Sequence, residues 1–288
     1  MEKNRLIIAI TIVLALRGCV GKDAEKSLLQ QSQGLFSWSD SVVTNQQEGE
    51  NLFDFMKKEQ LSVLYQHFSG DVNTGQIRKF LKRAADSKIQ VYYLTGDSQW
   101  ALDSDGIEMK ERVKKAAKIN RGLLAEQRLK GVMMDTEPYL LPEWERDEVS
   151  VMETYLASMK EGYKETDRHN LTYIACIPFY YDKKGYEKQL EELIASACDG
   201  LAVMNYSKFD EAEQIKTEME LVQKYGCSIT VIYELQKPGK HGLTEWNTYY
   251  NEGISGVRES VKQLEQIYGK DRLSFALHDY KGILERMS

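Results

Sequence analysis

Two carboxylic acids that stand two residues apart, Asp135 and Glu137, are the strongest chemical feature of this sequence. They end a short apolar segment that begins at Gly131, a pattern typical of a buried β-strand. Because alternate residues of a strand point to the same face, both carboxyl groups should point the same way. Two close carboxylates resist simultaneous ionisation, so one pKa rises and that group keeps its proton. The pair therefore predicts a general acid, with a structural ion pair or a cation site as the alternative.

Further polar and aromatic residues follow other apolar segments, and carboxylates end six of eight such segments. All four tryptophans also follow one, and aromatic faces stack on the apolar faces of sugar rings, although one or two should pack loops instead. Adjacent strand residues point to opposite faces, so Asp279 is expected in the pocket and His278 behind it. The predicted substrate contacts are Trp38, Asp97, Trp100, Tyr139, Asn205 and Asp279.

The elements that must position these residues alternate between two kinds of pattern. Short apolar segments, rich in β-branched and aromatic residues, are separated by longer amphipathic helical stretches such as 108–128. Eight such units in about 250 residues predict a single (β/α)₈ barrel, a TIM barrel, whose active site lies at the C-terminal ends of the strands. An open doubly wound sheet is disfavoured, because no glycine-rich loop follows the first strand. The predicted strands span residues 35–38, 62–68, 90–94, 131–137, 171–178, 200–206, 228–234 and 274–279.

The first 21 residues predict an export signal. Lys3 and Arg5 precede an apolar run over residues 6–16, which is too short for a comfortable membrane span. The run ends at Arg17-Gly18-Cys19, which resembles a bacterial lipobox except for Arg17. We therefore expect lipidation of Cys19, a tether over 22–34 and the barrel over 35–288. The protein would be exported and either anchored to a membrane or secreted.

Composition narrows the possible partners. The 288 residues are 42% hydrophobic and 28% charged, which is typical of a globular protein. The net charge is −6 and no basic stripe is present, so nucleic acid is not an expected partner. Cys176, Cys198 and Cys227 have no metal-site spacing and are expected as buried thiols, although a disulfide between the last two stays open. No metal or cofactor is expected, and the sequence does not indicate an oligomeric state.

Two segments resemble motifs of family 18 glycoside hydrolases, which include chitinases and endo-β-N-acetylglucosaminidases. The segment from Gly131 to Glu137 is similar to the fourth-strand pattern Asp-Gly-x-Asp-x-Asp-x-Glu, with Lys130 and Met133 in place of the two earlier aspartates. On the sixth predicted strand, Val203-Met204-Asn205-Tyr206 resembles the family's Met-x-Tyr-Asp, with Ser207 in place of the aspartate.

This resemblance implies a specific chemistry. Glu137 would protonate the glycosidic oxygen, and Asp135 would orient the substrate's acetamido group, whose carbonyl oxygen attacks the anomeric carbon. Tyr206 would hydrogen-bond to the same group. The substrate would be a β-linked glycan that contains N-acetylhexosamine, such as chitin, peptidoglycan or an N-glycan core. Because Met133 replaces an aspartate behind Asp135, weak activity or a barrel that only binds sugar is the alternative.

A second resemblance leads to a different mechanism. Barrels of glycoside hydrolase clan A carry Asn-Glu-Pro on strand four and a glutamate on strand seven. Thr136-Glu137-Pro138 and Glu234 stand at these places, although Thr136 replaces the asparagine. Glu234 would then be the nucleophile of a retaining glycosidase, with its carboxyl about 5–5.5 Å from that of Glu137.

Overall fold

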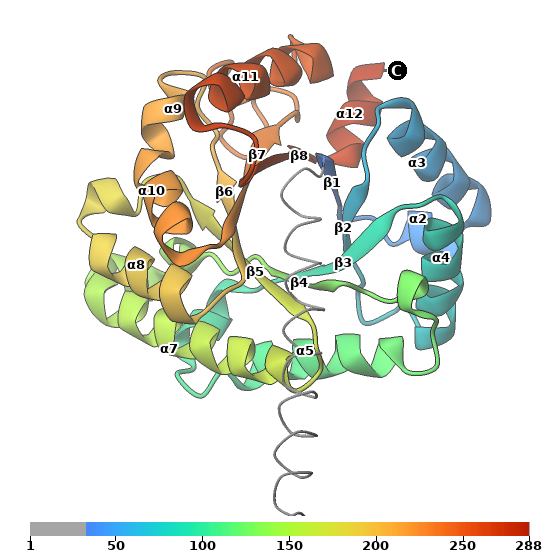
Figure 1. Cartoon of the computed structure of the whole chain (residues 1–288), viewed down its shortest axis with the longest axis horizontal. Helices are drawn as coiled ribbons and strands as arrows, with labels where there is room; N and C mark the ends of the chain where they lie inside the picture. Colours follow the sequence, from blue (N-terminus) through green and yellow to red (C-terminus); the bar gives the residue numbers. More distant parts are fainter. Residues whose placement is uncertain (1–32, 288) are drawn as a thin grey trace, which may run out of the picture.

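The apolar segments form eight short strands, and each strand pairs in parallel with the next one along the chain (Figure 1). β8 pairs with β1, so the sheet closes on itself. The computed structural model describes residues 33–287, and this part of the chain confirms the predicted (β/α)₈ barrel. The strands are β1 (Gln33–Ser37), β2 (Val63–His67), β3 (Gln90–Thr95), β4 (Gly131–Met134), β5 (Thr172–Pro178), β6 (Gly200–Met204), β7 (Ser228–Glu234) and β8 (Leu273–His278).

The predicted export signal, Cys19 and residues 22–32 of the predicted tether lie outside the described residues. The tether was expected to reach residue 34, but β1 begins at Gln33 and Gly34 pairs with Val63 and Ala276. This position in β1 requires a glycine, because a Cβ here would lie 2.8 Å from the ring of Tyr65. The last two residues of the predicted tether, Gln33 and Gly34, are therefore part of the barrel.

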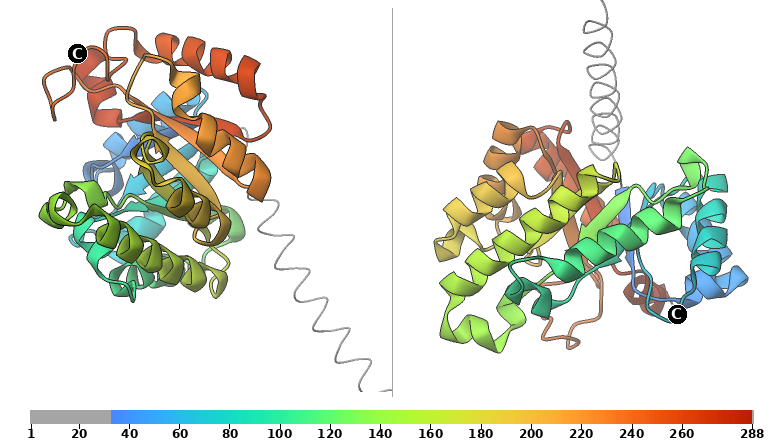
Figure 2. Two further views of the ribbon diagram at one scale, coloured as in Figure 1. Left: turned by 90° about the vertical axis from the view of Figure 1, so that its left-hand side faces the viewer. Right: turned by 90° about the horizontal axis from the view of Figure 1, so that it is seen from below.

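Helices cover the outside of the barrel, as Figure 1 and the side views of Figure 2 show. The predicted helix over 108–128 ends at Asn120, because Gly122 adopts a left-handed φ of 78° and the Asn120 side chain bonds to the Leu129 backbone. Among residues 33–287, no helix has the length and hydropathy needed to cross a membrane. The helices are α2 (Ser41–Thr44), α3 (Gln46–Lys58), α4 (Thr74–Asp86), α5 (Ile107–Asn120), α6 (Pro142–Arg146), α7 (Glu148–Asp167), α8 (Glu187–Ser196), α9 (Glu211–Gln214), α10 (Lys216–Tyr225), α11 (Gly253–Tyr268) and α12 (Tyr280–Met287).

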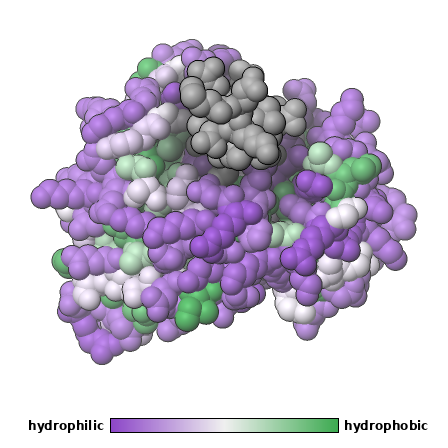
Figure 3. All heavy atoms as spheres, turned by 60° about the horizontal axis from the view of Figure 1, so that its bottom comes forward, coloured by the Kyte–Doolittle hydropathy of each residue, from purple (hydrophilic) through white to green (hydrophobic). Residues whose placement is uncertain are grey.

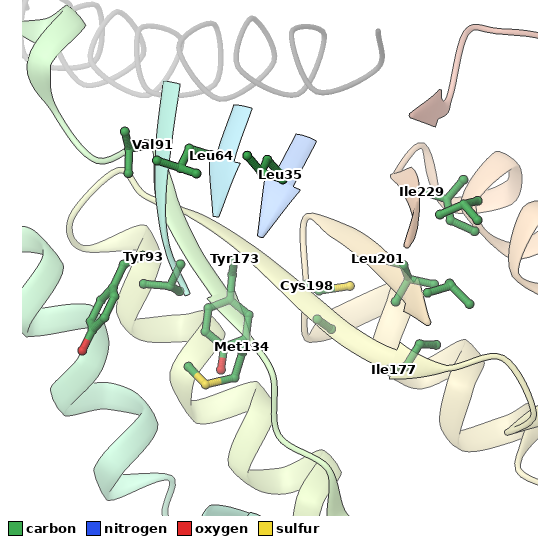
Figure 4. Close-up of a cluster of buried hydrophobic side chains, with 14 of the residues drawn as sticks. Leu35, Leu64, Val91, Tyr93, Met134, Tyr173, Ile177, Cys198, Leu201 and Ile229 are labelled. Carbon is green, nitrogen blue, oxygen red and sulfur yellow. The ribbon is translucent and has the colours of Figure 1, made fainter. Parts of the chain in front are cut away.

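Two hydrophobic layers hold the strands in place. The outer layer lies between strands and helices, and Figure 4 shows part of it, including Leu64, Tyr173 and Ile229. The inner layer fills the barrel and contains Tyr65, Met133 and other side chains at alternate strand positions. Each fully buried large apolar side chain contributes roughly 1.5–3 kcal/mol to folding.

Cys176, Cys198 and Cys227 are buried thiols and form no disulfide. The surface in Figure 3 is mostly hydrophilic outside the grey atoms.

Two glycines let the chain pack closely around β4. A Cβ on Gly131 would lie 2.0 Å from the carbonyl oxygen of Thr172, and one on Gly96 would lie 1.8 Å from that of Asp135. Neither position accepts a side chain without moving backbone. The two glycines therefore fix how β4 sits between β3 and β5, and with it the place of Asp135.

Candidate active site

A cavity of about 1010 Å³ opens at the C-terminal ends of the strands. Every strand except β2 contributes to its wall, either directly or through the loop that follows it. Its volume is at the upper end of the range of small-molecule sites. Within residues 33–287, no three His, Cys, Asp or Glu side chains gather as a metal site requires. The four predicted catalytic residues all line the cavity: Asp135, Glu137, Tyr206 and Glu234.

The two carboxyl groups that follow β4 share one face of the chain. The Asp135 N–H donates to the Thr95 carbonyl oxygen at 2.8 Å, which extends the pairing with β3 beyond the end of β4. Asp135 and Glu137 both line the cavity, whereas Thr136 between them is buried. This arrangement follows the alternation that the sequence predicts.

Both of these carboxyl groups hold protons more strongly than usual. Burial raises the pKa of Asp135, and its Oδ1 atom is buried without a hydrogen-bond partner. Burial and then the charge of Asp135 raise the pKa of Glu137. The Tyr139 hydroxyl donates a hydrogen bond to Oε2 of Glu137, and this bond opposes the rise only in part. The pair therefore retains a proton to a higher pH than an ordinary carboxyl group would.

Two neighbours of Asp135 distinguish this site from the family 18 pattern. Met133 is buried inside the barrel, at the position where the motif has an aspartate. On the next strand, the thiol of Cys176 lies beside the Asp135 carboxyl and lines the cavity. Burial and then the charge of Asp135 raise the pKa of this thiol, so it stays protonated. The sequence indicates only a buried thiol at Cys176, because Asp135 lies 41 residues away along the chain.

The last two strands present a differently bonded carboxyl group. One carboxylate oxygen of Glu234 accepts the Gln236 N–H at 2.7 Å, and the other contacts Nδ1 of His278 at 2.8 Å. The Nε1–H of Trp38 donates to Nε2 of His278 at 3.2 Å. Burial lowers the pKa of His278, but the hydrogen bond and charge of Glu234 outweigh it, so the net shift is upward. Glu234 is therefore held on both oxygens.

Tyr206 completes the predicted catalytic set. Its ring lies 6.1 Å from that of His278, and its backbone carbonyl oxygen accepts a hydrogen bond from the Asn247 side chain at 2.8 Å. Burial and then the charge of Glu234 raise the pKa of Tyr206, so its hydroxyl keeps its proton. Tyr206 thus offers a hydrogen-bond donor to the cavity.

The predicted substrate contacts divide into two groups. Trp38, Asp97 and Tyr139 line the cavity, whereas Trp100, Asn205 and Asp279 do not. Trp100 packs against the outer core with the Arg112 guanidinium 5.1 Å from its ring. The Asn205 side chain is buried and its amide contacts the Glu211 carbonyl oxygen at 3.4 Å.

The expected roles of His278 and Asp279 are reversed in the structure. His278 lines the cavity, and Asp279 is buried with Oδ1 accepting the Gly282 N–H at 2.9 Å in the first turn of α12. Because β8 ends at His278 and the helix begins at Tyr280, Asp279 serves the helix terminus instead of the pocket.

Aromatic residues form part of the wall, but mostly not the predicted tryptophans. Of the four, Trp38 alone lines the cavity; Trp144 is buried against Tyr181, and Trp246 packs on Phe209 at the surface. Tyr139 and Tyr180 pack edge to face at 5.8 Å and supply aromatic surface instead. For Phe179, Tyr180 and Gln236 the sequence signal was their position just after a strand. The cavity-lining residues that sequence reasoning missed include Cys176, Phe179, Tyr180, Gln236, Asn247 and His278.

Comparison with known proteins supports the fold. No family model and no curated protein matches this chain. A family 18 chitinase from Cycas revoluta, solved with (GlcNAc)3, matches with a TM-score of 0.53 and 14% identity over 88% of this chain and 96% of that one. A chitinase from Bacteroides thetaiotaomicron matches with a TM-score of 0.56 and 11% identity over 88% and 90%. A putative deoxyribose-phosphate aldolase from Toxoplasma gondii also matches, with a TM-score of 0.52 and 10% identity over 93% and 97%.

These matches confirm the predicted resemblance of the fold to family 18 glycoside hydrolases. The match to a putative aldolase is of similar strength, so the fold alone does not identify the reaction.

Proposed function

We propose that this protein hydrolyses a β-linked glycan that contains N-acetylhexosamine, with Glu137 as the general acid. The observation that carries the proposal is the Asp135–Glu137 pair, which lines one cavity with the pKa of both groups raised. A carboxyl group that stays protonated beside a second carboxyl group is what substrate-assisted cleavage needs. The (GlcNAc)3 complex of the Cycas revoluta chitinase supports the choice of sugar.

In the proposed mechanism, Glu137 gives its proton to the glycosidic oxygen while the substrate's own acetamido oxygen attacks the anomeric carbon. Asp135 accepts the acetamido N–H, and the Tyr206 hydroxyl donates to the acetamido oxygen. The Tyr139 hydroxyl holds one carboxyl oxygen of Glu137 and leaves the other for the substrate. Water then opens the cyclised intermediate, and the Glu137 carboxylate takes up a proton from that water.

A retaining mechanism with Glu234 as nucleophile is the second route. The hydrogen bonds on Glu234 weigh against it, because each carboxylate oxygen already accepts one bond, from Gln236 or from His278, and this lowers its nucleophilicity. Two reagents separate the routes. A thiazoline that mimics the cyclised acetamido intermediate should inhibit only the substrate-assisted enzyme. A fluorinated glycoside that traps a covalent ester should label Glu234 only in the retaining enzyme.

A barrel that binds glycan without cleaving it is the second candidate function. Met133 favours it, because this buried methionine cannot relay a proton to Asp135 as the aspartate of the motif could. Calorimetry and product analysis on the same N-acetylglucosamine oligomers, peptidoglycan fragments and N-glycan cores distinguish the two functions. Hydrolysis supports the enzyme, binding without hydrolysis supports the binding protein, and neither binding nor hydrolysis contradicts both.

We propose in addition that the chain is exported and anchored through a lipid on Cys19. The proposal rests on the charged and apolar pattern of the first 21 residues and on the lipobox-like segment before Cys19. Mass spectrometry of the protein from its membrane fraction should show the lipid on Cys19. Cys19→Ser should remove it and shift the protein out of that fraction, and an unmodified Cys19 would contradict the anchor.

A further inference from the structure

Two hydrogen bonds link three consecutive strands on the side of the barrel away from β4. Glu234 ends β7, His278 ends β8 and Trp38 follows β1, and these three strands are neighbours in the closed sheet. Glu234 and His278 are direct partners in the β7–β8 register. The contact between Glu234 and His278 is thus set by backbone pairing.

The hydrogen bonds determine where the proton of His278 must lie. Nδ1 faces a carboxylate oxygen of Glu234 at 2.8 Å and therefore carries the proton. Nε2 faces the Trp38 Nε1–H at 3.2 Å, and since an indole nitrogen only donates, Nε2 must accept. Glu234 is itself fixed by the Gln236 N–H at 2.7 Å and is almost fully buried. A chain of bonds thus runs from the Gln236 backbone to the indole of Trp38.

Trp38 is the side chain on which this chain of bonds ends. It is the one tryptophan of the protein that lines the cavity, and 37% of its surface is exposed. The ring of His67 packs against it at 5.5 Å, so part of its surface is supported while part stays open. A supported aromatic face in a cavity wall is suited to stacking on the apolar face of a sugar ring.

We propose that Trp38 is a ring-binding platform of this cavity, and that Glu234 acts through His278 as its positioning residue. That the bound ring is a hexosamine rests on the proposed function above. The hydrogen bonds that connect Glu234, His278 and Trp38 do not depend on it. Glu234 is then neither a nucleophile nor an acid, although it ends a strand in the candidate active site. Its task is to hold one tautomer of His278, which in turn holds the indole.

The protonation state of His278 should control its hydrogen bond with Trp38. The groups that face His278 are Glu234 on β7, Asp279 beside it, Asp135 after β4, and the rings of Tyr206 and Phe36. The carboxylates favour the imidazolium, and burial opposes it. When His278 takes up a second proton, Nε2 carries a hydrogen and can no longer accept from Trp38. The indole then loses its hydrogen-bond acceptor, so acidification should release Trp38.

Nuclear magnetic resonance of the indole N–H groups in the full chain tests this directly. The Trp38 signal is assigned by its loss in Trp38→Phe, and Trp100, Trp144 and Trp246 serve as internal controls. Over about pH 5 to 9 the Trp38 signal should follow one titration with a midpoint above the usual His value of 6.5. The titration should move to lower pH in Glu234→Gln and disappear in His278→Gln.

A Trp38 signal that does not respond to pH, or that responds equally in His278→Gln, overturns the positioning role. If His278→Gln fails to fold, the Glu234→Gln variant decides alone, because a midpoint that does not move also contradicts the proposal.

The affinity for an N-acetylglucosamine oligomer is a separate experiment. Trp38→Ala should weaken binding more than tenfold and Trp38→Phe only a few-fold. Wild-type protein that binds no oligomer contradicts the proposed function and the platform, whereas the indole titration still tests the chain of bonds.

Discussion

The two sides of the cavity carry carboxyl groups in opposite states. After β4, the Oδ1 atom of Asp135 has no hydrogen-bond partner, and the pKa of both Asp135 and Glu137 is raised. At the end of β7, Glu234 is bonded on both oxygens, to a backbone N–H and to His278. All three carboxyl groups line the same cavity, so a place in the cavity wall does not distinguish them.

The three carboxyl groups differ in their hydrogen bonds, and therefore in the chemistry that each can perform. A carboxyl group that is buried and poorly bonded can hold a proton and release it to a substrate. A carboxylate that accepts a hydrogen bond on both oxygens is a weaker nucleophile and holds its partners in one orientation. The comparison therefore assigns the chemistry to the β4 side and the positioning to the β7–β8 side.

Replacing the acid should have the largest effect on this comparison. Glu137→Gln removes the proton that the leaving oxygen needs, and kcat should fall by about 10²–10⁴ with little change in KM. Steady-state kinetics on an N-acetylglucosamine oligomer measures this. Glu145→Gln, on the exposed part of α6, is the matched control and should keep full activity. Turnover that survives in Glu137→Gln would show that the acid lies elsewhere.

Replacing the other β4 carboxyl group should cost less rate but should also move the pH profile. Asp135→Asn should lower kcat about a hundredfold, near 2.7 kcal/mol, because the acetamido group loses its orienting carboxylate. Glu137 works protonated, so activity falls as pH rises through its raised pKa. Since the charge of Asp135 contributes to that rise, the alkaline limb of Asp135→Asn should lie at lower pH than in wild type. An unmoved limb would mean that the two groups do not interact.

Glu218, which does not line the cavity, tests whether burial without hydrogen bonds is enough to raise the pKa of a carboxyl group. Burial raises the pKa of Glu218 on α10 to about 8, and neither of its oxygens has a hydrogen-bond partner. The folded state thus holds a proton that the unfolded state releases near 4.5, and stability falls as pH rises between these values.

Between about pH 6 and 8 this should cost wild type on the order of 2 kcal/mol of unfolding free energy. Glu218→Gln cannot ionise and should lose that much less over the same range in urea unfolding. Glu220→Gln, exposed on the same helix, should keep the wild-type slope. Equal slopes in all three proteins would place the ionised Glu218 in a well-solvated site.

Replacing the bonded carboxylate should have the smallest effect. Glu234→Gln should raise KM a few-fold through a less ordered Trp38 and leave kcat within a few-fold of wild type. Loss of a nucleophile would instead abolish turnover. A collapse of kcat as large as that of Glu137→Gln would therefore reverse the assignment of the two sides.

Much of this architecture could be predicted along the chain. Strand alternation is a local property with a period of two, so it placed Asp135 and Glu137 on one face and identified the strands in their correct order. Position after a strand also predicted that Tyr206 and Glu234 reach the barrel mouth. These predictions succeeded because each depends on neighbours within a few residues.

The predictions that failed depend on partners that are distant in sequence. Trp100 stands after a strand like Trp38, but Arg112 and the outer core hold it away from the cavity. Asp279 was expected in the pocket, but the start of α12 takes its side chain. Strand-end position alone cannot distinguish a side chain that faces the axis from one that packs under a helix.

The sequence by itself determined the barrel and the acidic pair, because strand periodicity and strand order are written in consecutive residues. Only the tertiary structure decided that Cys176 lies beside Asp135 and that His278 joins Glu234 to Trp38 through hydrogen bonds. Each of these contacts crosses from one strand to another, 44 residues apart for His278 and Glu234 and 240 for Trp38 and His278. Hydrogen bonds act only within about 3.5 Å, so these contacts form only once the closed sheet has brought those strands together.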